Sequence, residues 1–225
     1  MTMSTPLHRH RLAAEAAARA QRPASGYGAE PTQGQALLLA KLIEDRRTLK
    51  SIKSIEQKAE AKRRMLPEYL AWVEGVLVAD AGGEDEIVTT CMVWSLDTGD
   101  FERALTLGDY CLRHDLKLPE HYQRDVAALL VEQIADAAKA ARALGEPFDI
   151  EVIERVAELT AERDIHDQIR AKLHKETGLL LEAEQPDPAL WNLKRAQALN
   201  ASVGVKKDIE RIERAIAKRE AGAQH

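Results

Sequence analysis

Apolar residues recur along this chain at the three-, four- and seven-residue intervals of an amphipathic helix. One stripe runs without interruption between Gln35 and Met65, and further stripes cover residues 150–159 and 205–216. Between residues 65 and 150, short polar segments at residues 80–86, 97–100, 116–120 and 143–149 separate further apolar stripes. The pattern predicts helices joined by short turns, which is the arrangement of helical hairpins.

The composition favours the same fold class. Aromatic residues make up only 4% of the 225 residues, and Ala, Leu, Glu, Arg and Lys dominate. These five are strong helix formers, whereas the β-branched and aromatic runs typical of strands are scarce. We therefore predict an all-α protein.

Two of the predicted hairpins share a pattern of small residues. Each copy follows an acidic turn, and the aligned sets are Ala104, Leu105 and Cys111 with Ala189, Leu190 and Ala196. Small side chains let antiparallel helices approach closely, as in tetratricopeptide-type helix pairs. The copies lie 85 positions apart, without the regular period of about 34 residues of such arrays. The pattern therefore predicts tetratricopeptide-like packing but no true repeat array.

Four segments follow from these patterns. Residues 1–34 form an Ala- and Arg-rich arm with a Pro/Gly linker, and we expect them to be flexible because few large apolar residues are available to bury a face. Residues 35–66 form one long basic helix. Residues 67–148 form a central domain of helical hairpins, and residues 149–225 form C-terminal hairpins with an amphipathic end helix.

Charge is distributed unevenly behind the net charge of −5. Residues 1–64 contain 13 Lys or Arg against 6 Asp or Glu, residues 65–160 contain 7 against 20, and residues 161–225 contain 12 against 11. Positive charge is therefore concentrated at the front of the chain, where a polyanion can bind despite the acidic average.

No long apolar window and no secretory signal occur in the sequence. We therefore expect a soluble, intracellular protein without a membrane partner. Cys91 and Cys111 both lie within apolar helical patterns, which favours buried, reduced thiols over a disulfide.

An acidic cluster is the first candidate for chemistry. Asp97, Asp100 and Asp109 lie within thirteen positions, and His114 follows them. A metal-dependent nuclease needs several carboxylates that converge on cations about 4 Å apart. However, Gly99 is suited to a turn and Asp100 is placed to cap the next helix, with Asp97 in the same turn. Capping is therefore the favoured interpretation, and Asp109 is expected to be solvated.

Other catalytic patterns are missing from the sequence. The histidines are scattered over different predicted helices, and His166 and His174 are eight positions apart, too far to share an ion. The stretch "SVGVKK" at residues 202–207 lacks the glycines and the hydroxyl of a Walker loop. We predict no catalytic residue, no metal ligand and no cofactor.

The basic helix is the second candidate. A solvated helical face explains its charges as well as phosphate binding does, but a neighbouring arm with Arg9, Arg11, Arg19 and Arg22 favours a nucleic-acid partner. We therefore assign residues 35–66 to DNA binding. The predicted DNA-binding residues are Arg46, Arg47, Lys50, Lys53, Lys58, Lys62, Arg63 and Arg64.

Several ordered stretches resemble a known family. They are "LPEYLAWVEGVL", "VWSLDTGDFERALTLGDYCLRH", "ELTAERDIHDQIRAKLHKETGLLL" and "GVKKDIERIERAI". Together they resemble the small terminase subunit of temperate tailed phages of the Peduovirus type, from about residue 37 to about residue 217. One departure is the C-terminus: some relatives continue into a Lys- and Arg-rich tail, whereas this chain ends in "REAGAQH".

The resemblance implies a role in viral genome packaging. A small terminase subunit binds the cohesive-end region of double-stranded phage DNA, assembles as a homo-oligomeric ring, and recruits the DNA to a large terminase subunit with ATPase and nuclease activities. With the resemblance in view, we also assign oligomerisation to residues 35–66. It works in the host cytoplasm during capsid assembly. Members are sometimes labelled as the endonuclease subunit, although no self-contained nuclease site is visible in this sequence.

Two rival hypotheses stay open at this point. In one, the chain is itself a metal-dependent endonuclease that cuts the cohesive-end site. In the other, it is a helical-repeat adaptor that binds proteins and never contacts DNA.

Overall fold

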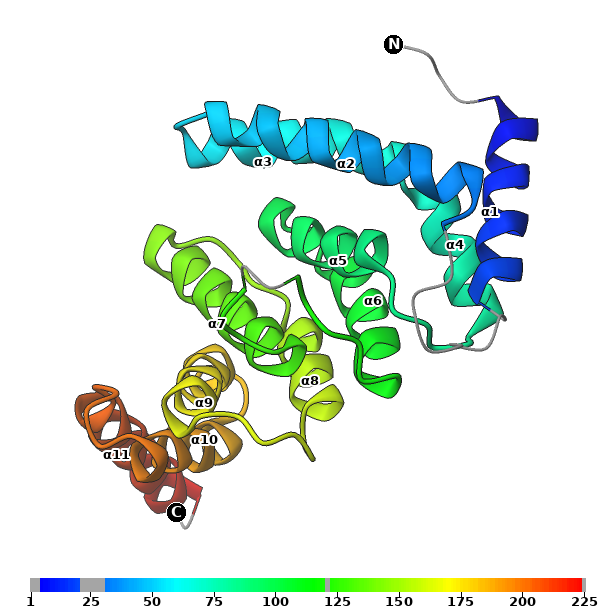
Figure 1. The fold of residues 1–225 in the computed structure, drawn as a ribbon. Helices are drawn as coiled ribbons and strands as arrows, with labels where there is room; N and C mark the ends of the chain where they lie inside the picture. The colour runs from blue at the N-terminus through cyan, green and yellow to red at the C-terminus, as the bar shows by residue number, and fades with distance from the viewer. Residues whose placement is uncertain (1–4, 21–30, 120–121, 224–225) are drawn as a thin grey trace. The chain divides into compact units, whose positions relative to one another are not determined.

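The computed structural model describes residues 5–20, 31–119 and 122–223, and all regular structure in these ranges is helical (Figure 1). This confirms the predicted all-α class. The chain forms two compact units, residues 1–126 and 127–225, so the division falls inside the predicted central domain of residues 67–148. In the described ranges, none of the helices combines the length and the apolar character that crossing a membrane requires.

The first unit contains six α-helices and one short 3₁₀ turn within its described ranges. They are α1 (Pro6–Ala20), α2 (Gln33–Ser51), α3 (Ile55–Met65), η1 (Leu66–Glu68), α4 (Leu70–Ala79), α5 (Glu86–Thr98) and α6 (Phe101–Arg113). Its core is centred on α5, where every residue from Ile87 to Leu96 is buried. Trp72 and Tyr69, from the start of α4, are fully enclosed against it.

Helix α1 packs tightly on α4 through small residues. A Cβ atom added to Gly75 would lie 2.1 Å from the carbonyl oxygen of Ala13, so the two backbones are in direct contact. Leu12 and Ala16 are buried in the same helix. Within the predicted flexible arm, residues 6–20 thus form a helix packed on α4, and Gly75 on the partner helix provides the close approach without large apolar residues. Residues 1–4 and 21–30 of the predicted arm and linker lie outside the described residues.

The predicted single basic helix is also divided. Ile52 and Ser54 have extended backbone conformations, and the Ser54 hydroxyl accepts a hydrogen bond from the Gln57 amide at 3.3 Å, which caps α3. The sequence pattern does not reveal this break, because the apolar residues keep a helical spacing on both sides of it. Asp45 is a charged residue on the buried side of α2, where it accepts a hydrogen bond from the buried Tyr69 hydroxyl at 2.7 Å.

The second unit is built from α7 (Val126–Leu144), α8 (Ile150–Leu159), α9 (Asp167–Leu181), α10 (Pro186–Leu199) and α11 (Lys206–Ala223). Helix α7 begins at the last residue of the first unit. The predicted C-terminal stripe is confirmed, because Val205, Ile209 and Ile212 pack with Ala189 and Leu193 of α10.

Small residues lie at the contact surfaces of both predicted hairpins. Ala104 and Cys111 of α6 are buried, and so are Ala189 and Ala196 of α10. Burial raises the pKa of the free Cys111 thiol to about 12, and it also raises the pKa of the free Cys91 thiol. The prediction of buried, reduced cysteines is confirmed, whereas tetratricopeptide-like packing stays a prediction.

Candidate nucleic-acid interface

The acidic turn between α5 and α6 is a capping structure. Gly99 ends α5 with a φ of 76°, and the Asp100 carboxylate accepts a hydrogen bond from the Arg103 amide at 3.2 Å. The same carboxylate forms an ion pair with the Arg103 side chain. These contacts confirm the predicted roles of Gly99 and Asp100.

The prediction for Asp97 was wrong. Asp97 lies in the last turn of α5 rather than in the interhelical turn, and its carboxylate pairs with Lys62 of α3 at 2.5 Å. Asp109 was expected to be solvated; its side chain is 38% exposed, and it accepts a hydrogen bond from Arg113, one helical turn further along α6, at 3.1 Å. Each aspartate therefore has its own basic partner.

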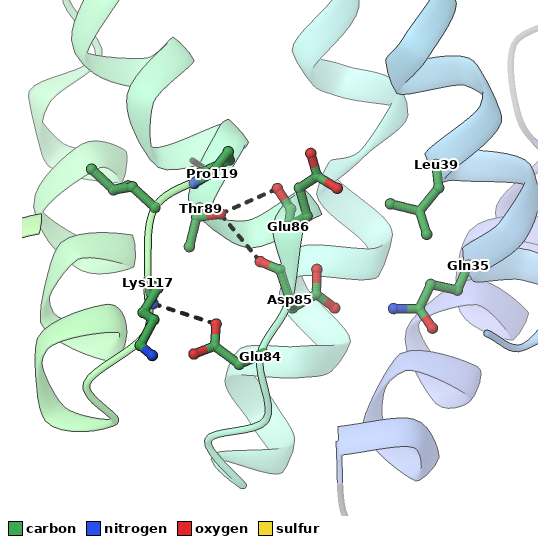
Figure 2. Close-up of a pocket in the computed structure, with 9 residues that line it drawn as sticks. Gln35, Leu39, Glu84, Asp85, Glu86, Thr89, Lys117 and Pro119 are labelled. Carbon is green, nitrogen blue, oxygen red and sulfur yellow. Dashed lines mark hydrogen bonds between the residues drawn. The ribbon is translucent and has the colours of Figure 1, made fainter. Parts of the chain in front are cut away.

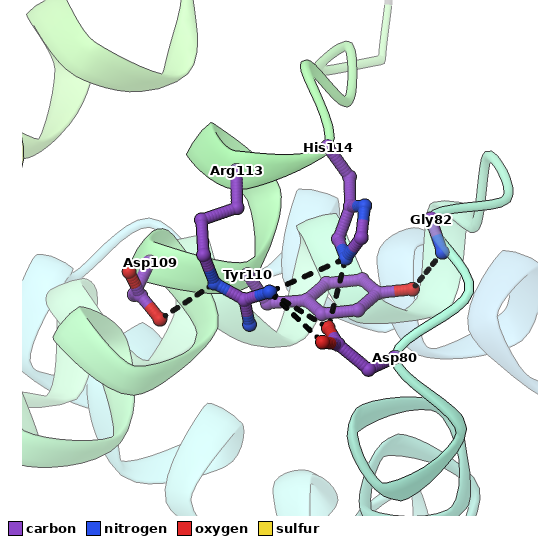
Figure 3. A network of polar contacts seen from close by, with 6 residues as sticks. All are labelled: Asp80, Gly82, Asp109, Tyr110, Arg113 and His114. Atoms are coloured by element: carbon purple, nitrogen blue, oxygen red, sulfur yellow. Dashed lines mark hydrogen bonds and ion pairs between the residues drawn. The ribbon is translucent and has the colours of Figure 1, made fainter.

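His114 belongs to a polar network with a residue outside the acidic turn. Figure 3 shows His114 and Arg113, at the end of α6, directed at Asp80, at the end of α4. The Asp80 carboxylate lies 2.8 Å from both the His114 ring and the Arg113 guanidinium. These contacts, the one from His114 first, hold the pKa of the Asp80 carboxyl below its ordinary value. The network ties two helix ends together.

Two of the eight predicted DNA-binding residues are engaged inside the first unit. Arg46 pairs with Glu86 at the start of α5 at 2.5 Å and donates a hydrogen bond to the Thr90 hydroxyl at 2.8 Å. Lys62, whose side chain is only 16% exposed, pairs with Asp97 at the end of α5. These contacts attach both arms of the α2–α3 hairpin to α5. No local sequence pattern indicates them, because the partners are 35 to 44 positions apart.

The turn between α2 and α3 presents unpaired cations. Lys50 and Lys53 are exposed, and within the described part of the chain neither forms an ion pair or a hydrogen bond through its side chain. Ile55, the first residue of α3, is 86% exposed beside them. This turn lies at the end of α2 opposite to α1, about 25 Å along the helix from Gly34 at 1.5 Å per residue. We call residues 50–55 the hairpin tip.

The other four predicted DNA-binding residues form weaker contacts within the first unit. Arg47 pairs with Glu44 in the same helix and stays 71% exposed, and Arg63 and Arg64 share Glu60. Arg63 also donates to the carbonyl of Thr98 at 3.0 Å. Lys58 is half-buried and makes no ion pair among the described residues. Exposed pairs of this kind contribute little to stability and exchange readily for a phosphate contact.

Comparison with known proteins decides the family. The model of the family described as "Phage small terminase subunit" matches residues 39–168, more than half of the chain. The chain belongs to the phage small terminase subunit family. It is 43% identical over 213 residues to a protein of Escherichia phage P2 named "Terminase, endonuclease subunit", a match that covers 94% of this chain and 85% of the relative. A "Probable terminase, endonuclease subunit" of Haemophilus phage HP1 is 27% identical over 194 residues, which cover 78% of this chain and 68% of that relative. No solved structure matches.

All eight predicted DNA-binding residues and the Asp97–Asp100 turn of this small terminase subunit lie within the range that the family model matches. Among the described residues, no three His, Cys, Asp or Glu side chains are grouped so that they could hold one metal ion. Ile55 is the residue at the hairpin tip that sequence reasoning missed. Its position outside the apolar stripe is the signal that could have identified it as exposed.

A pocket of about 1110 Å³ in the first unit has the opposite charge. Figure 2 shows the carboxylates of Glu84, Asp85 and Glu86 between the segment at Lys117 and the α2 residues Gln35 and Leu39. The Asp85 carboxylate has a structural role, because it accepts hydrogen bonds from the Trp72 indole at 2.8 Å and from the Ile87 amide at 2.9 Å. An acidic lining repels phosphate, so the pocket is unsuited to the DNA backbone.

Proposed function

We propose that this chain is the small terminase subunit of a phage DNA-packaging complex. It binds the cohesive-end region of double-stranded phage DNA and recruits it to a large terminase subunit with ATPase and nuclease activities. The observation that carries the proposal is the pair of exposed, unpaired lysines, Lys50 and Lys53, at the hairpin tip of a small terminase family member.

The hairpin tip is the part of the basic region best suited to phosphate contact. Lysines without a carboxylate partner bind phosphate without first breaking an ion pair, so their full charge is available to displace condensed counterions. Arg47 adds a cation on the last turns of the same helix. Arg46 and Lys62 instead fix the hairpin on α5, so DNA affinity depends on the other six predicted residues.

The subunits assemble as a homo-oligomeric ring, in which one surface repeats around a closed axis. A ring multiplies the weak contacts of one hairpin tip, because several tips contact the same duplex at once. Helix α11 is the candidate for docking the large subunit. Ile209 and Ile212 bury its inner side against α10, and Arg211 pairs at 2.6 Å with Glu182, the residue that follows α9. Most other residues of α11 are exposed.

A salt titration of DNA binding tests the proposal. The purified full chain is titrated with a duplex carrying the cohesive-end sequence at several salt concentrations, and the K50Q/K53Q variant is compared with K139Q/K218Q. Lys139 and Lys218 are exposed and far from the tip in sequence, so the control loses the same charge. The slope of log Kd against log salt should fall by about 0.9 for each phosphate contact that is lost.

Two outcomes contradict the proposal. An unchanged slope in K50Q/K53Q removes the hairpin tip from the DNA interface. Absence of salt-dependent binding by the unmodified chain favours the adaptor that never contacts DNA.

The endonuclease names of the two phage relatives favour a second candidate, a metal-dependent endonuclease subunit. The discriminating experiment incubates the purified chain with cohesive-end DNA and magnesium or manganese. Cleavage that disappears in the D97N and D100N variants supports the nuclease, whereas uncut DNA supports the packaging adaptor.

A further inference from the structure

The second unit contains a pocket of about 390 Å³ between α8, α9 and α10. Its apolar floor includes Ile153 and Leu173, which are 0% and 2% exposed. Polar and aromatic side chains from the two antiparallel helices α9 and α10 surround this floor. The volume lies within the range of about 300 to 1,000 Å³ that is typical of small-molecule sites.

Arg170 of α9 carries a positive charge that no carboxylate balances within the described residues. Its guanidinium donates to the Thr160 hydroxyl at 3.0 Å, to the Thr160 carbonyl at 2.6 Å and to the Arg163 carbonyl at 3.1 Å. All three acceptors are neutral, and partial burial lowers the pKa of Arg170. A half-buried cation held only by neutral acceptors keeps its attraction for an anion.

Arg195 of α10 brings a second cation to the same pocket. It is exposed, and in the described ranges it forms no ion pair; Glu154, the acidic lining residue, pairs with neither arginine. Arg170, Arg195 and His174 all line this pocket. Burial is the main cause that lowers the pKa of His174; the hydrogen bond with Asn192 opposes this, and the charges of Arg195 and Arg170 add to it. Two like charges therefore converge on one place.

Trp191 provides the aromatic surface of the pocket. It lines the pocket and is 61% exposed, so its ring is accessible to a ligand. Its ring packs edge-on against His174, with the centroids 5.7 Å apart and the planes at 75°. Trp191 precedes Arg195 by one helical turn, so an aromatic surface and a guanidinium lie side by side on α10.

We propose that this pocket binds a single unpaired nucleotide, with its base stacked on Trp191 and its phosphate between Arg170 and Arg195. A carboxylate side chain would occupy only the guanidinium end of the pocket, whereas a nucleotide offers an anion and a flat aromatic base together. The nucleotide is a free mononucleotide or a unit of single-stranded DNA, because both present the same chemistry. This binding is additional to duplex binding by the hairpin tip in the first unit.

Tryptophan fluorescence tests the proposal directly. Trp72 and Trp94 are 0% and 3% exposed, so quenching by a soluble ligand reports on Trp191. The full chain is titrated separately with dAMP, with a short deoxyadenosine oligonucleotide and with a blunt duplex of the same length. Quenching by dAMP or by the oligonucleotide supports the proposal and identifies which source binds, and quenching by neither overturns it.

Matched variants then locate the ligand. R195Q should weaken binding about tenfold, because it removes a charge-assisted contact to the phosphate. W191L should abolish the quenching and weaken binding of a labelled oligonucleotide, followed by anisotropy, by about fivefold or more. K194Q is the control, because Lys194 lies on the same helix but pairs with Glu213 of α11. Equal affinity of R195Q, W191L and K194Q overturns the proposal.

Two further measurements distinguish nucleotide binding in this pocket from duplex binding at the hairpin tip and from self-association. The K50Q/K53Q variant should leave the quenching by dAMP unchanged, so failure of the hairpin tip to bind DNA and failure of this pocket are distinguishable. The solution mass of R195Q is compared with that of the unmodified chain. A change in mass without nucleotide binding identifies the pocket as a contact between copies of the chain and overturns the proposal.

Discussion

The carbonyl oxygen of Ala13 lies 2.1 Å from where the Cβ of an alanine at position 75 would stand. Because that space is occupied by backbone, G75A should separate α1 from α4 and lower the free energy of unfolding by about 1–3 kcal/mol, as overpacking does. Chemical denaturation measures the loss. Gly83 has no atom within 4 Å of its Cβ position, so G83A is the matched control. Equal stability of the two variants would contradict close packing of α1.

Replacement of Asp100 separates capping from catalysis. D100A removes the acceptor for the Arg103 amide and should lower the free energy of unfolding by about 1 kcal/mol, whereas D100N keeps a side-chain oxygen there and should lower it by only a few tenths. Thermal or chemical denaturation distinguishes the two variants. If D100N were as unstable as D100A, the cap would not be the source of the effect.

The Asp80 network predicts a dependence of stability on acid. The pKa of Asp80 is lowered in the folded chain, so its contribution is present at neutral pH and is lost as the pH falls through the folded pKa, below the ordinary aspartate range. D80N, which tolerates the left-handed backbone of this residue, should be less stable than the unmodified chain at neutral pH and equally stable once the pH is below the folded pKa. Unfolding measured across this range provides the test. A difference that persists in strong acid indicates a lost contact other than the ion pairs.

His174 predicts a second loss of stability, which begins at a higher pH. Burial lowers its pKa, so the unfolded chain binds a proton more readily, and stability should fall as the pH decreases through about 6.5, the ordinary histidine pKa. The loss should level off below the folded pKa. H174Q should remove this part of the pH profile while the part that Asp80 causes in stronger acid remains. An identical profile in both proteins through the ordinary histidine range would exclude His174 as its source.

The sequence predicted those parts of the fold in which large apolar residues recur in one helix. Val205, Ile209 and Ile212 are an example, because their spacing alone requires a buried face. The packing of helix α1 escaped prediction because its interface depends on Gly75, more than sixty positions away from Ala13, and a helix rich in alanine shows no stripe of its own. Such a contact is visible only when both helices are known.

In the candidate site, the sequence predicted local contacts but not contacts between helices. Asp100 was identified correctly because a cap is local and depends on residues three positions apart. Asp97 was misplaced, and Arg46 and Lys62 were grouped with the exposed cations, because their partners lie on another helix. The sequence shows which residues are charged, but the ion pairs formed in the folded chain decide which of those charges remain available to a ligand.

Under the proposed function, the attachment of the basic α2–α3 hairpin to the acidic part of the first unit also affects how the protein meets DNA. Residues 46–64 contain 8 Lys or Arg against 2 Asp or Glu, whereas residues 65–126 contain 4 against 13. Because Arg46 and Lys62 hold these two regions in one unit, the unit is an electric dipole. In the field of a duplex, a dipole experiences a torque before any contact forms, which turns the hairpin tip toward the phosphates and the acidic helices away from them. Orientation would then precede binding, and lowering the salt concentration should accelerate association more than it slows dissociation.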